Sequence, residues 1–178
     1  MESRLYLTPA GPEHKEAVWN YRSEFLETGE PLCGSALLDK AHSYEEWLAM
    51  NIKNRRQETA LPGLVEATTY LAFLKETREL VGMIDFRHAL NDYLRQYGGH
   101  IGYSVRKSRR RQGYGSEMLG LCLAECRAYG LERVLITCGK NNLASAAAIR
   151  AAGGVLENEV PHEGSLTQRY WVTLTEKQ

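Results

Sequence analysis

One turn in this sequence has the residue types and spacing to hold an anion. It reads RRRQGYGS from Arg109 to Ser116 and stands between a strand-like run that ends at Val105 and a helical pattern. A helix start offers unpaired N–H groups and a positive dipole end, and Gly113 and Gly115 carry no side chain that would keep an anion from the backbone. We therefore predict that this turn binds phosphate. The alternative is that the glycines only make the turn and the arginines form a solvated surface.

The glycine spacing does not match two better-known phosphate loops. A P-loop needs Gly, four residues, Gly, then Lys and Ser or Thr, and no such string occurs in the chain. The dinucleotide-binding fingerprint would need a third Gly or Ala at position 118, which is Met118. Both classes of nucleotide site are therefore disfavoured.

The turn resembles the Gln/Arg-x-x-Gly-x-Gly/Ala motif of the GNAT superfamily of N-acetyltransferases. The match runs from Arg110 to Gly115, and the order of elements is similar from about Leu80 to Gly154. The resemblance implies that acetyl-CoA is the co-substrate. It also implies that backbone N–H groups of the turn hold the pyrophosphate and that the strand Tyr103 to Val105 pairs with the pantetheine arm.

A second segment, Asn141 to Ser145, resembles the Asn-x-x-Ser helix of the same family, in which the Asn side chain and the helix contact the coenzyme. Taken alone, Asn142 and Ser145 would predict ordinary helix capping, and both roles can coexist. The coenzyme-binding residues implied by the two segments are Tyr103, Ser104, Val105, Arg110, Arg111, Gln112, Gly113, Tyr114, Gly115, Ser116, Asn142 and Ser145.

The sequence departs from the family pattern at two positions. Many members place a Tyr seven residues after that Asn, as the acid that protonates the leaving thiolate, and here the position holds Ile149. Gly154 replaces the usual Phe of the closing Gly-Phe pair. These details resemble a poorly characterised branch of predicted acetyltransferases.

Acetyl transfer to an amine needs a deprotonated nucleophile, a polarised thioester carbonyl and a neutralised thiolate. We nominate His100 as the general base, because its position resembles that of a Glu used by several family members and an imidazole titrates near neutrality. An ordinary surface or hydrogen-bonded strand histidine is an equal alternative. The reserve candidates are His88, Asp85 and Glu66. Backbone N–H groups of the strand that carries Val105 are expected to polarise the carbonyl.

Tyr170, near the last strand, is the candidate acid, although the sequence does not show its direction. Tyr114, inside the turn, is expected to pack beside the coenzyme. The predicted catalytic residues are therefore His100 and Tyr170.

The pattern of apolar residues supplies the elements that would position these groups. Period-two alternation predicts strands at 4–8, 68–75, 80–88, 100–105, 133–138, 155–160 and 168–174. Helical spacing and capping signals predict helices at 13–26, from Ser43 onward, at 113–129 and at 143–152, with a helical turn at 91–96. The resemblance implies an α/β (α+β) GNAT-like fold. Its mixed, mostly antiparallel sheet of about six to seven strands would be flanked by about four helices and splayed to admit coenzyme A.

The composition narrows the class of protein. The 178 residues are expected to form one domain, 1–178, and the 22 basic and 22 acidic residues balance, which disfavours nucleic acid as a partner. No run approaches the roughly 20 apolar residues of a membrane span, so we expect a cytoplasmic protein. Cys122 and Cys126 lie at helical spacing without the partners of a zinc site, so we expect buried thiols and no metal.

These observations predict an acetyltransferase that uses acetyl-CoA and acts on a primary amine by direct attack in a ternary complex. The acceptor is a small-molecule or peptide amine that the sequence does not identify, and a homodimer is possible by family analogy. Ile149 motivates one alternative, a non-catalytic sensor that binds acetyl-CoA or coenzyme A. A nucleotide- or nucleic-acid-binding adaptor that uses Arg109 to Arg111 is a third interpretation, which the balanced charge disfavours.

Overall fold

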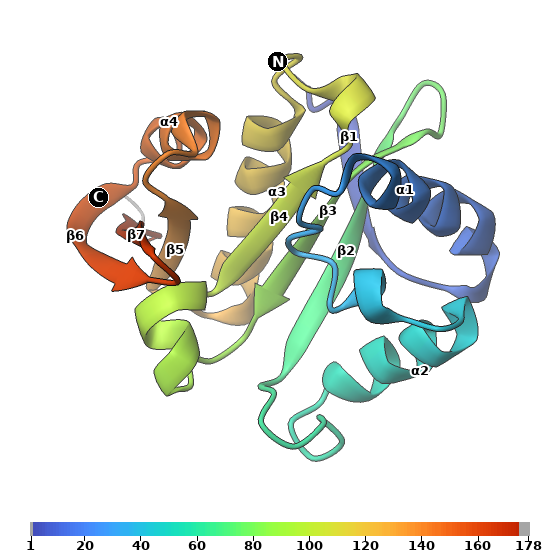
Figure 1. Ribbon diagram of the computed structural model, residues 1–178, viewed down its shortest axis with the longest axis horizontal. Coiled ribbons are helices and arrows are strands. Elements are labelled where there is room, and N and C mark those ends of the chain that lie inside the picture. Colours follow the sequence, from blue (N-terminus) through green and yellow to red (C-terminus); the bar gives the residue numbers. More distant parts are fainter. Residues whose placement is uncertain (1, 175–178) are drawn as a thin grey trace.

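The computed structural model describes residues 2–174, which fold into a seven-stranded sheet with helices on both faces (Figure 1). The strands are β1 (Leu5–Pro9), β2 (Ala67–Leu74), β3 (Leu80–Arg87), β4 (Ile101–Val105), β5 (Arg133–Gly139), β6 (Val155–His162) and β7 (Ser165–Thr173). The α-helices are α1 (Lys15–Thr28), α2 (Tyr44–Asn54), α3 (Tyr114–Tyr129) and α4 (Leu143–Ala151). Short helical turns are η1 (Pro12–His14), η2 (Leu38–Lys40), η3 (Leu94–Gly98) and η4 (Lys107–Arg109).

The sheet order is β1-β2-β3-β4-β5-β7-β6, and every neighbouring pair except β4 and β5 is antiparallel. The parallel pair β4–β5 brackets α3, as expected for a strand-helix-strand unit. This confirms the predicted mixed, mostly antiparallel sheet and its helical flanks.

Two separate hydrophobic cores hold the helices against the sheet. One lies under α1 and α2 and contains Tyr21, Trp47 and Met83, whereas the other lies under α3 and α4 and contains Met118 and Ile149. Figure 1 shows α1 and α2 in front of the sheet and α3 behind it. Successive residues of a strand point to opposite faces, and β2 and β3 therefore contribute to both cores.

The sheet opens between its two central strands. β4 and β5 share a single register pair, Ile101 with Ile136, so the rest of β4 has no neighbour on that side among the described residues. The neighbour on the other side, β3, pairs with all of β4. The opening therefore follows β4 toward Val105, where the basic turn begins.

Local signals in the sequence account for most element ends. Ser43 caps α2 by accepting a hydrogen bond from the Glu46 N–H at 3.2 Å, and Gly130 ends α3 with φ of 104°. The predicted turn at 91–96 is instead a π-helical turn at Leu94–Gly98. Within residues 2–174, no helix is both long and apolar enough to cross a membrane.

Candidate active site

A groove of about 570 Å³ lies in the opening of the sheet, and we call it the basic groove. Most of the predicted coenzyme-binding residues line it: Tyr103, Ser104, Val105, Arg110, Arg111, Gly113, Tyr114, Gly115, Ser116, Asn142 and Ser145. Gln112 does not line it, and its carbonyl accepts a hydrogen bond from Arg4 at 2.9 Å. The residues predicted from the sequence therefore line one groove, although they come from β4, α3 and α4.

The N-terminus of α3 opens into the basic groove without a cap. Gly113 precedes the helix with φ of 84°, a conformation that L-residues rarely adopt, and no side chain of residues 2–174 caps this end. The N–H groups of Tyr114, Gly115 and Ser116 belong to the first turn of the helix, so they have no intrahelical acceptor. Together with the helix dipole, they form a site suited to an anion.

The backbone of β4 supplies the long wall of the groove. Hydrogen bonds from Arg106 N–H to the Val81 carbonyl and from Arg87 N–H to the His100 carbonyl bracket the β3–β4 ladder. In this register the even-numbered residues of β4 direct their backbone N–H and C=O groups toward β3. The odd-numbered residues Tyr103 and Val105 therefore direct theirs into the opening. A linear ligand can therefore pair with β4 as a further strand would.

The arginines of the turn have different partners. Arg109 forms two bonds with Glu79, at 2.9 and 2.6 Å, so it serves the structure of the turn. Arg110 lies 2.6 Å from Glu30, and its Nε donates to the Val105 carbonyl at 3.0 Å. Arg111 has φ of 62° and makes no side-chain hydrogen bond or ion pair within the described residues. Arg111 is therefore the cation of the turn that is free to meet a ligand.

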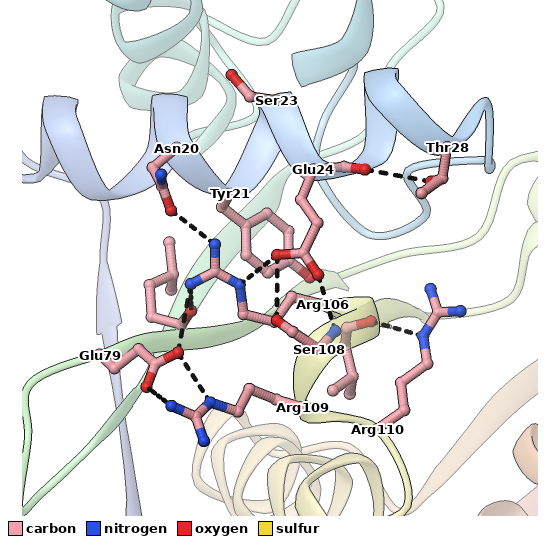
Figure 2. Close-up of polar contacts among 12 residues, drawn as sticks. Asn20, Tyr21, Ser23, Glu24, Thr28, Glu79, Arg106, Ser108, Arg109 and Arg110 are labelled. Atoms are coloured by element: carbon pink, nitrogen blue, oxygen red, sulfur yellow. Dashed lines mark hydrogen bonds and ion pairs between the residues drawn. The ribbon is translucent and has the colours of Figure 1, made fainter.

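A buried arginine fastens α1 to the turn (Figure 2). Arg106 is 9% exposed and donates to Glu24 at 2.8 Å, to Asn20 at 2.7 Å and to the Leu80 carbonyl at 3.2 Å. Glu24 also accepts the N–H of Ser108 at 2.8 Å. Burial alone would raise the pKa of the Glu24 carboxyl, but the hydrogen bonds from Ser108 and Arg106 outweigh it and hold that pKa below its usual value. The network fixes the end of β4 and the start of the basic turn.

The start of α4 closes the far side of the groove. Asn142 caps the helix by accepting the Ser145 N–H at 3.1 Å, and the hydroxyls of Ser145 and Tyr103 lie 2.8 Å apart. Burial raises the pKa of the Tyr103 hydroxyl, and the bond with Ser145 offsets part of that effect. The hydroxyl therefore stays protonated at neutral pH. Ile149, at the position of the usual acid Tyr, is fully buried.

His100 lies outside the basic groove. Its Nδ1 accepts the Leu135 N–H at 2.9 Å, and its backbone N–H donates to the Leu135 carbonyl at 2.7 Å, so it joins β4 to β5. Burial, assisted by Arg87 and Arg95, lowers the pKa of His100 to about 4. A buried imidazole with one nitrogen already engaged is poorly placed to accept a substrate proton, so the geometry argues against His100 as general base.

Tyr170 also lies away from the groove. It is 1% exposed, its hydroxyl donates to Gln168 at 2.8 Å, and Arg150 donates to it at 3.4 Å. Both hydrogen-bond partners of its hydroxyl belong to β7 and α4, so the geometry argues against Tyr170 as the acid. Of the reserve bases, His88 and Glu66 lie 2.9 Å apart at the far end of β3 and line neither this groove nor the cavity described next.

Sequence reasoning missed the other wall of the groove. Phe25, Glu30, Pro31 and Cys33, from the end of α1 and the segment after it, face the basic turn. Their approach is a tertiary contact across about 80 residues of chain, and no local pattern announces it. The one available signal was the acidic Glu30 opposite a basic turn.

A second cavity, of about 430 Å³, lies between β2, β3, α2 and the segment that follows α1. We call it the α1/α2 cavity. Asp85, Arg87 and Thr69 lie in it, and it shares the 31–34 segment with the groove: Pro31 and Cys33 line the groove, whereas Leu32 and Gly34 line the cavity. The groove and the cavity therefore meet at the 31–34 segment.

A sheet that opens beside an uncapped helix, with a basic turn between them, is an arrangement suited to a phosphorylated ligand that pairs along one strand. A family model described as an acetyltransferase (GNAT) domain matches residues 4–155. The chain therefore belongs to the GNAT family of acetyltransferases, whose acetyl donor is acetyl-CoA. Within residues 2–174, no group of three or more His, Cys, Asp or Glu side chains is placed to hold a metal ion.

Solved acetyltransferases share the fold over nearly the whole chain. The ribosomal L7/L12 alpha-N-protein acetyltransferase RimL, solved with coenzyme A, is 22% identical at a TM-score of 0.69, with 97% of this chain and 95% of that one covered. A Salmonella typhimurium acetyl transferase that modifies the N-terminal serine of L7/L12 is 20% identical at a TM-score of 0.68, with 97% of this chain and 96% of that one covered. The Vibrio fischeri ribosomal-protein-S5-alanine acetyltransferase is 14% identical at a TM-score of 0.72, with 97% of this chain and 94% of that one covered. No curated protein sequence matches the chain.

Proposed function

We propose that this protein transfers the acetyl group of acetyl-CoA to a primary amine by direct attack in a ternary complex. The observation that carries the proposal is the uncapped start of α3, whose N–H groups open into a groove that follows the free edge of β4. A pyrophosphate satisfies those N–H groups, and a pantetheine arm satisfies the edge of β4. Family membership supplies the acetyl donor.

In this proposal, different residues of the groove bind different parts of the coenzyme. The first turn of α3 holds the pyrophosphate, and Arg111 adds a guanidinium that makes no hydrogen bond or ion pair with residues 2–174. Arg110 binds phosphate by releasing Glu30, an exposed pair that costs little to break. The starts of α3 and α4 both point positive dipole ends at the groove.

The edge of β4 also suits the chemical step. The N–H groups of Tyr103 and Val105 point into the opening, and one of them donates to the thioester oxygen as negative charge develops on it. The amine nitrogen forms the new C–N bond, and the C–S bond breaks with its electron pair on sulfur. No covalent enzyme intermediate is needed.

For the proton that neutralises the thiolate, the geometry favours Tyr103 over Tyr170. Tyr103 lines the basic groove, is kept protonated by burial, and is hydrogen-bonded to Ser145, whose hydroxyl relays a replacement proton. This assignment gives the chain an acid from β4 although Ile149 stands at the usual helix position.

Thiol release and ligand-dependent stability test the proposal together. Acetyl-CoA at about 100 times its dissociation constant should stabilise the protein by about 2.7 kcal/mol, which for a chain of this size raises Tm by roughly 5 to 10 °C. ATP and NAD at the same concentration should shift it far less. Thiol release from acetyl-CoA should then rise when a primary amine is added. Stabilisation by acetyl-CoA without turnover of any amine would support the sensor instead.

A further inference from the structure

The α1/α2 cavity meets the basic groove where only backbone separates them. Gly34 packs directly on the Gly102 and Tyr103 backbone, and Gly102 has no side chain to thicken the wall. Asp85 pairs with Gly102 in the β3–β4 register, so the floor of the cavity lies one strand spacing, about 4.8 Å, from β4 and its groove. A ligand in this cavity is therefore placed beside the bond that the proposed reaction breaks.

A carboxylate forms the floor of the α1/α2 cavity. Asp85 is 6% exposed, its Oδ1 accepts the Thr69 hydroxyl at 2.9 Å, and its Oδ2 accepts Arg87 Nε at 3.1 Å. Arg87 thus forms an ion pair with Asp85, and its Nη1 also donates to the carbonyls of Gly98 and Gly99. An ionised carboxylate has room for about four hydrogen bonds, so Asp85 retains capacity for a ligand donor.

The walls above this carboxylate are mainly apolar and carry a few further polar groups. The apolar side chains are Leu32, Leu37, Met50, Leu64, Val65 and Leu94, and the amide side chains are Asn51, Asn54 and Asn91. Asn51 is 4% exposed and donates its amide to the Trp47 carbonyl at 2.8 Å, which leaves its Oδ1 without a partner among residues 2–174. Asp85 and Asn51 thus present acceptor oxygens among largely apolar walls.

Charge and volume select the ligand. The cavity is lined by two carboxylates, Asp39 and Asp85, and one guanidinium, Arg87, so it favours a cation. A volume of about 430 Å³ lies in the lower part of the range for small-molecule sites, roughly 300 to 1,000 Å³. A bulky polyhydroxylated amine would lose its hydration against these apolar walls.

We propose that the α1/α2 cavity is the acceptor site, that it takes a primary amine on a compact apolar body, and that Asp85 binds the ammonium. This inference rests on the proposed acetyl transfer. Asp85 accepts one ammonium proton and later passes it to water. The neutral nitrogen attacks the thioester carbon, the C–S bond breaks, and the second nitrogen proton leaves as the amide forms, while Tyr103 protonates the thiolate. One proton is released to solvent overall. The amine is either a free small molecule or the first residue of a peptide.

An acceptor panel tests this chemistry in the wild-type protein. Leucine amide, free leucine, the tripeptide amide Leu-Ala-Ala and kanamycin are compared by thiol release from acetyl-CoA. We expect kcat/KM for leucine amide to exceed that for leucine and for kanamycin at least tenfold, because a carboxylate or a polar body is disfavoured. A higher kcat/KM for the tripeptide than for leucine amide identifies a peptide source, and the reverse identifies a free amine. Preference for kanamycin or for leucine overturns the proposed class.

An isosteric variant tests the anchor. In Asp85→Asn the Thr69 contact is retained, and KM for leucine amide should rise about 10- to 100-fold, since bonds to charged groups are worth about 1.5–3 kcal/mol. The matched control is Asp92→Asn, at an exposed carboxylate that lines neither the cavity nor the groove, and its KM should change less than about threefold. Calorimetric titration with acetyl-CoA should give the same Kd for all three proteins.

The two levels of the proposal fail differently. An Asp85→Asn variant that binds acetyl-CoA and keeps the wild-type KM for leucine amide overturns the anchor while leaving acetyl transfer intact. Acetyl-CoA binding without turnover of any panel amine overturns acetyl transfer itself. If Asp85→Asn does not fold, the wild-type panel still decides the acceptor class.

Discussion

The arginines in and just before the basic turn have different roles. Arg106 is buried in a network with Glu24 and Asn20, Arg109 is held by Glu79, and Arg111 faces the groove without a partner in the described part of the chain. Removing the buried member of such a network leaves uncompensated charge, whereas removing an exposed one costs little stability. The charge run in the sequence therefore combines structural and ligand-facing residues that look alike in composition.

The proposed acid can be tested by removing one oxygen. Tyr103→Phe should lower kcat about 100-fold, the lower end of the range for general acid catalysis, and should change the Kd of acetyl-CoA less than threefold. Ser145→Ala breaks the same hydrogen bond but keeps the Tyr103 hydroxyl, so its kcat should fall less. Tyr129→Phe, at the exposed end of α3, controls for loss of a hydroxyl elsewhere. An unchanged kcat in Tyr103→Phe would remove this residue from the chemistry.

The lowered pKa of His100 predicts how the free energy of unfolding depends on pH. Its pKa is about 4 in the folded chain, below the ordinary value near 6.5, so the unfolded chain binds more protons between these values and stability falls as pH falls. From pH 7.5 to pH 5, His100 should cost about 2 kcal/mol of unfolding free energy. Urea unfolding of wild type and His100→Asn at both pH values measures this. Equal pH dependence in the two proteins would mean that His100 is not the buried neutral group described here.

Among the elements, α3 shows how far the sequence could be interpreted. The glycines, the helical spacing and the strand before them predicted the start of α3, because these signals are local, whereas its place beside a groove was implied by the family resemblance. His100 and Tyr170 were placed less well. Alternation predicts which face of the sheet a strand residue occupies. It does not predict that His100 will accept a hydrogen bond from the Leu135 N–H, or that the Tyr170 hydroxyl will donate one to Gln168. The wall from Glu30 to Cys33 and the Asp85 floor depend on long-range packing, which no local pattern encodes.

The two ends of α3 provide a matched pair of substitutions. Gly113 and Gly130 both have positive φ, so a side chain at either one strains the backbone, but only Gly113 borders the basic groove. Gly113→Asp should reduce acetyl-CoA affinity at least 100-fold, because it adds a negative side chain where the pyrophosphate is proposed to bind. Gly130→Asp should lose stability to a similar extent and keep its affinity. Calorimetric titration checks both, and equal losses of affinity would show a general effect of strain.

In the whole molecule, two binding spaces lie beside each other. The free edge of β4 faces the basic groove, while the α1/α2 cavity is built from β2, β3, α2 and the segment that follows α1. The groove and the cavity share residues 31–34, whereas α2 lines the cavity and not the groove. In the proposed reaction, α2 can therefore set acceptor choice without altering the donor site, whereas changes at 31–34 should affect both.

A crystal structure with bound acetyl-CoA is the most direct test of the donor site. The account predicts pyrophosphate oxygens at about 2.7–3.2 Å from the N–H groups of Tyr114, Gly115 and Ser116, with the pantetheine amides paired to β4. It also predicts that Arg110 leaves Glu30 for a phosphate. A coenzyme that lies outside the opening between β4 and β5, or a first turn of α3 whose N–H groups bind only protein or water, would contradict it.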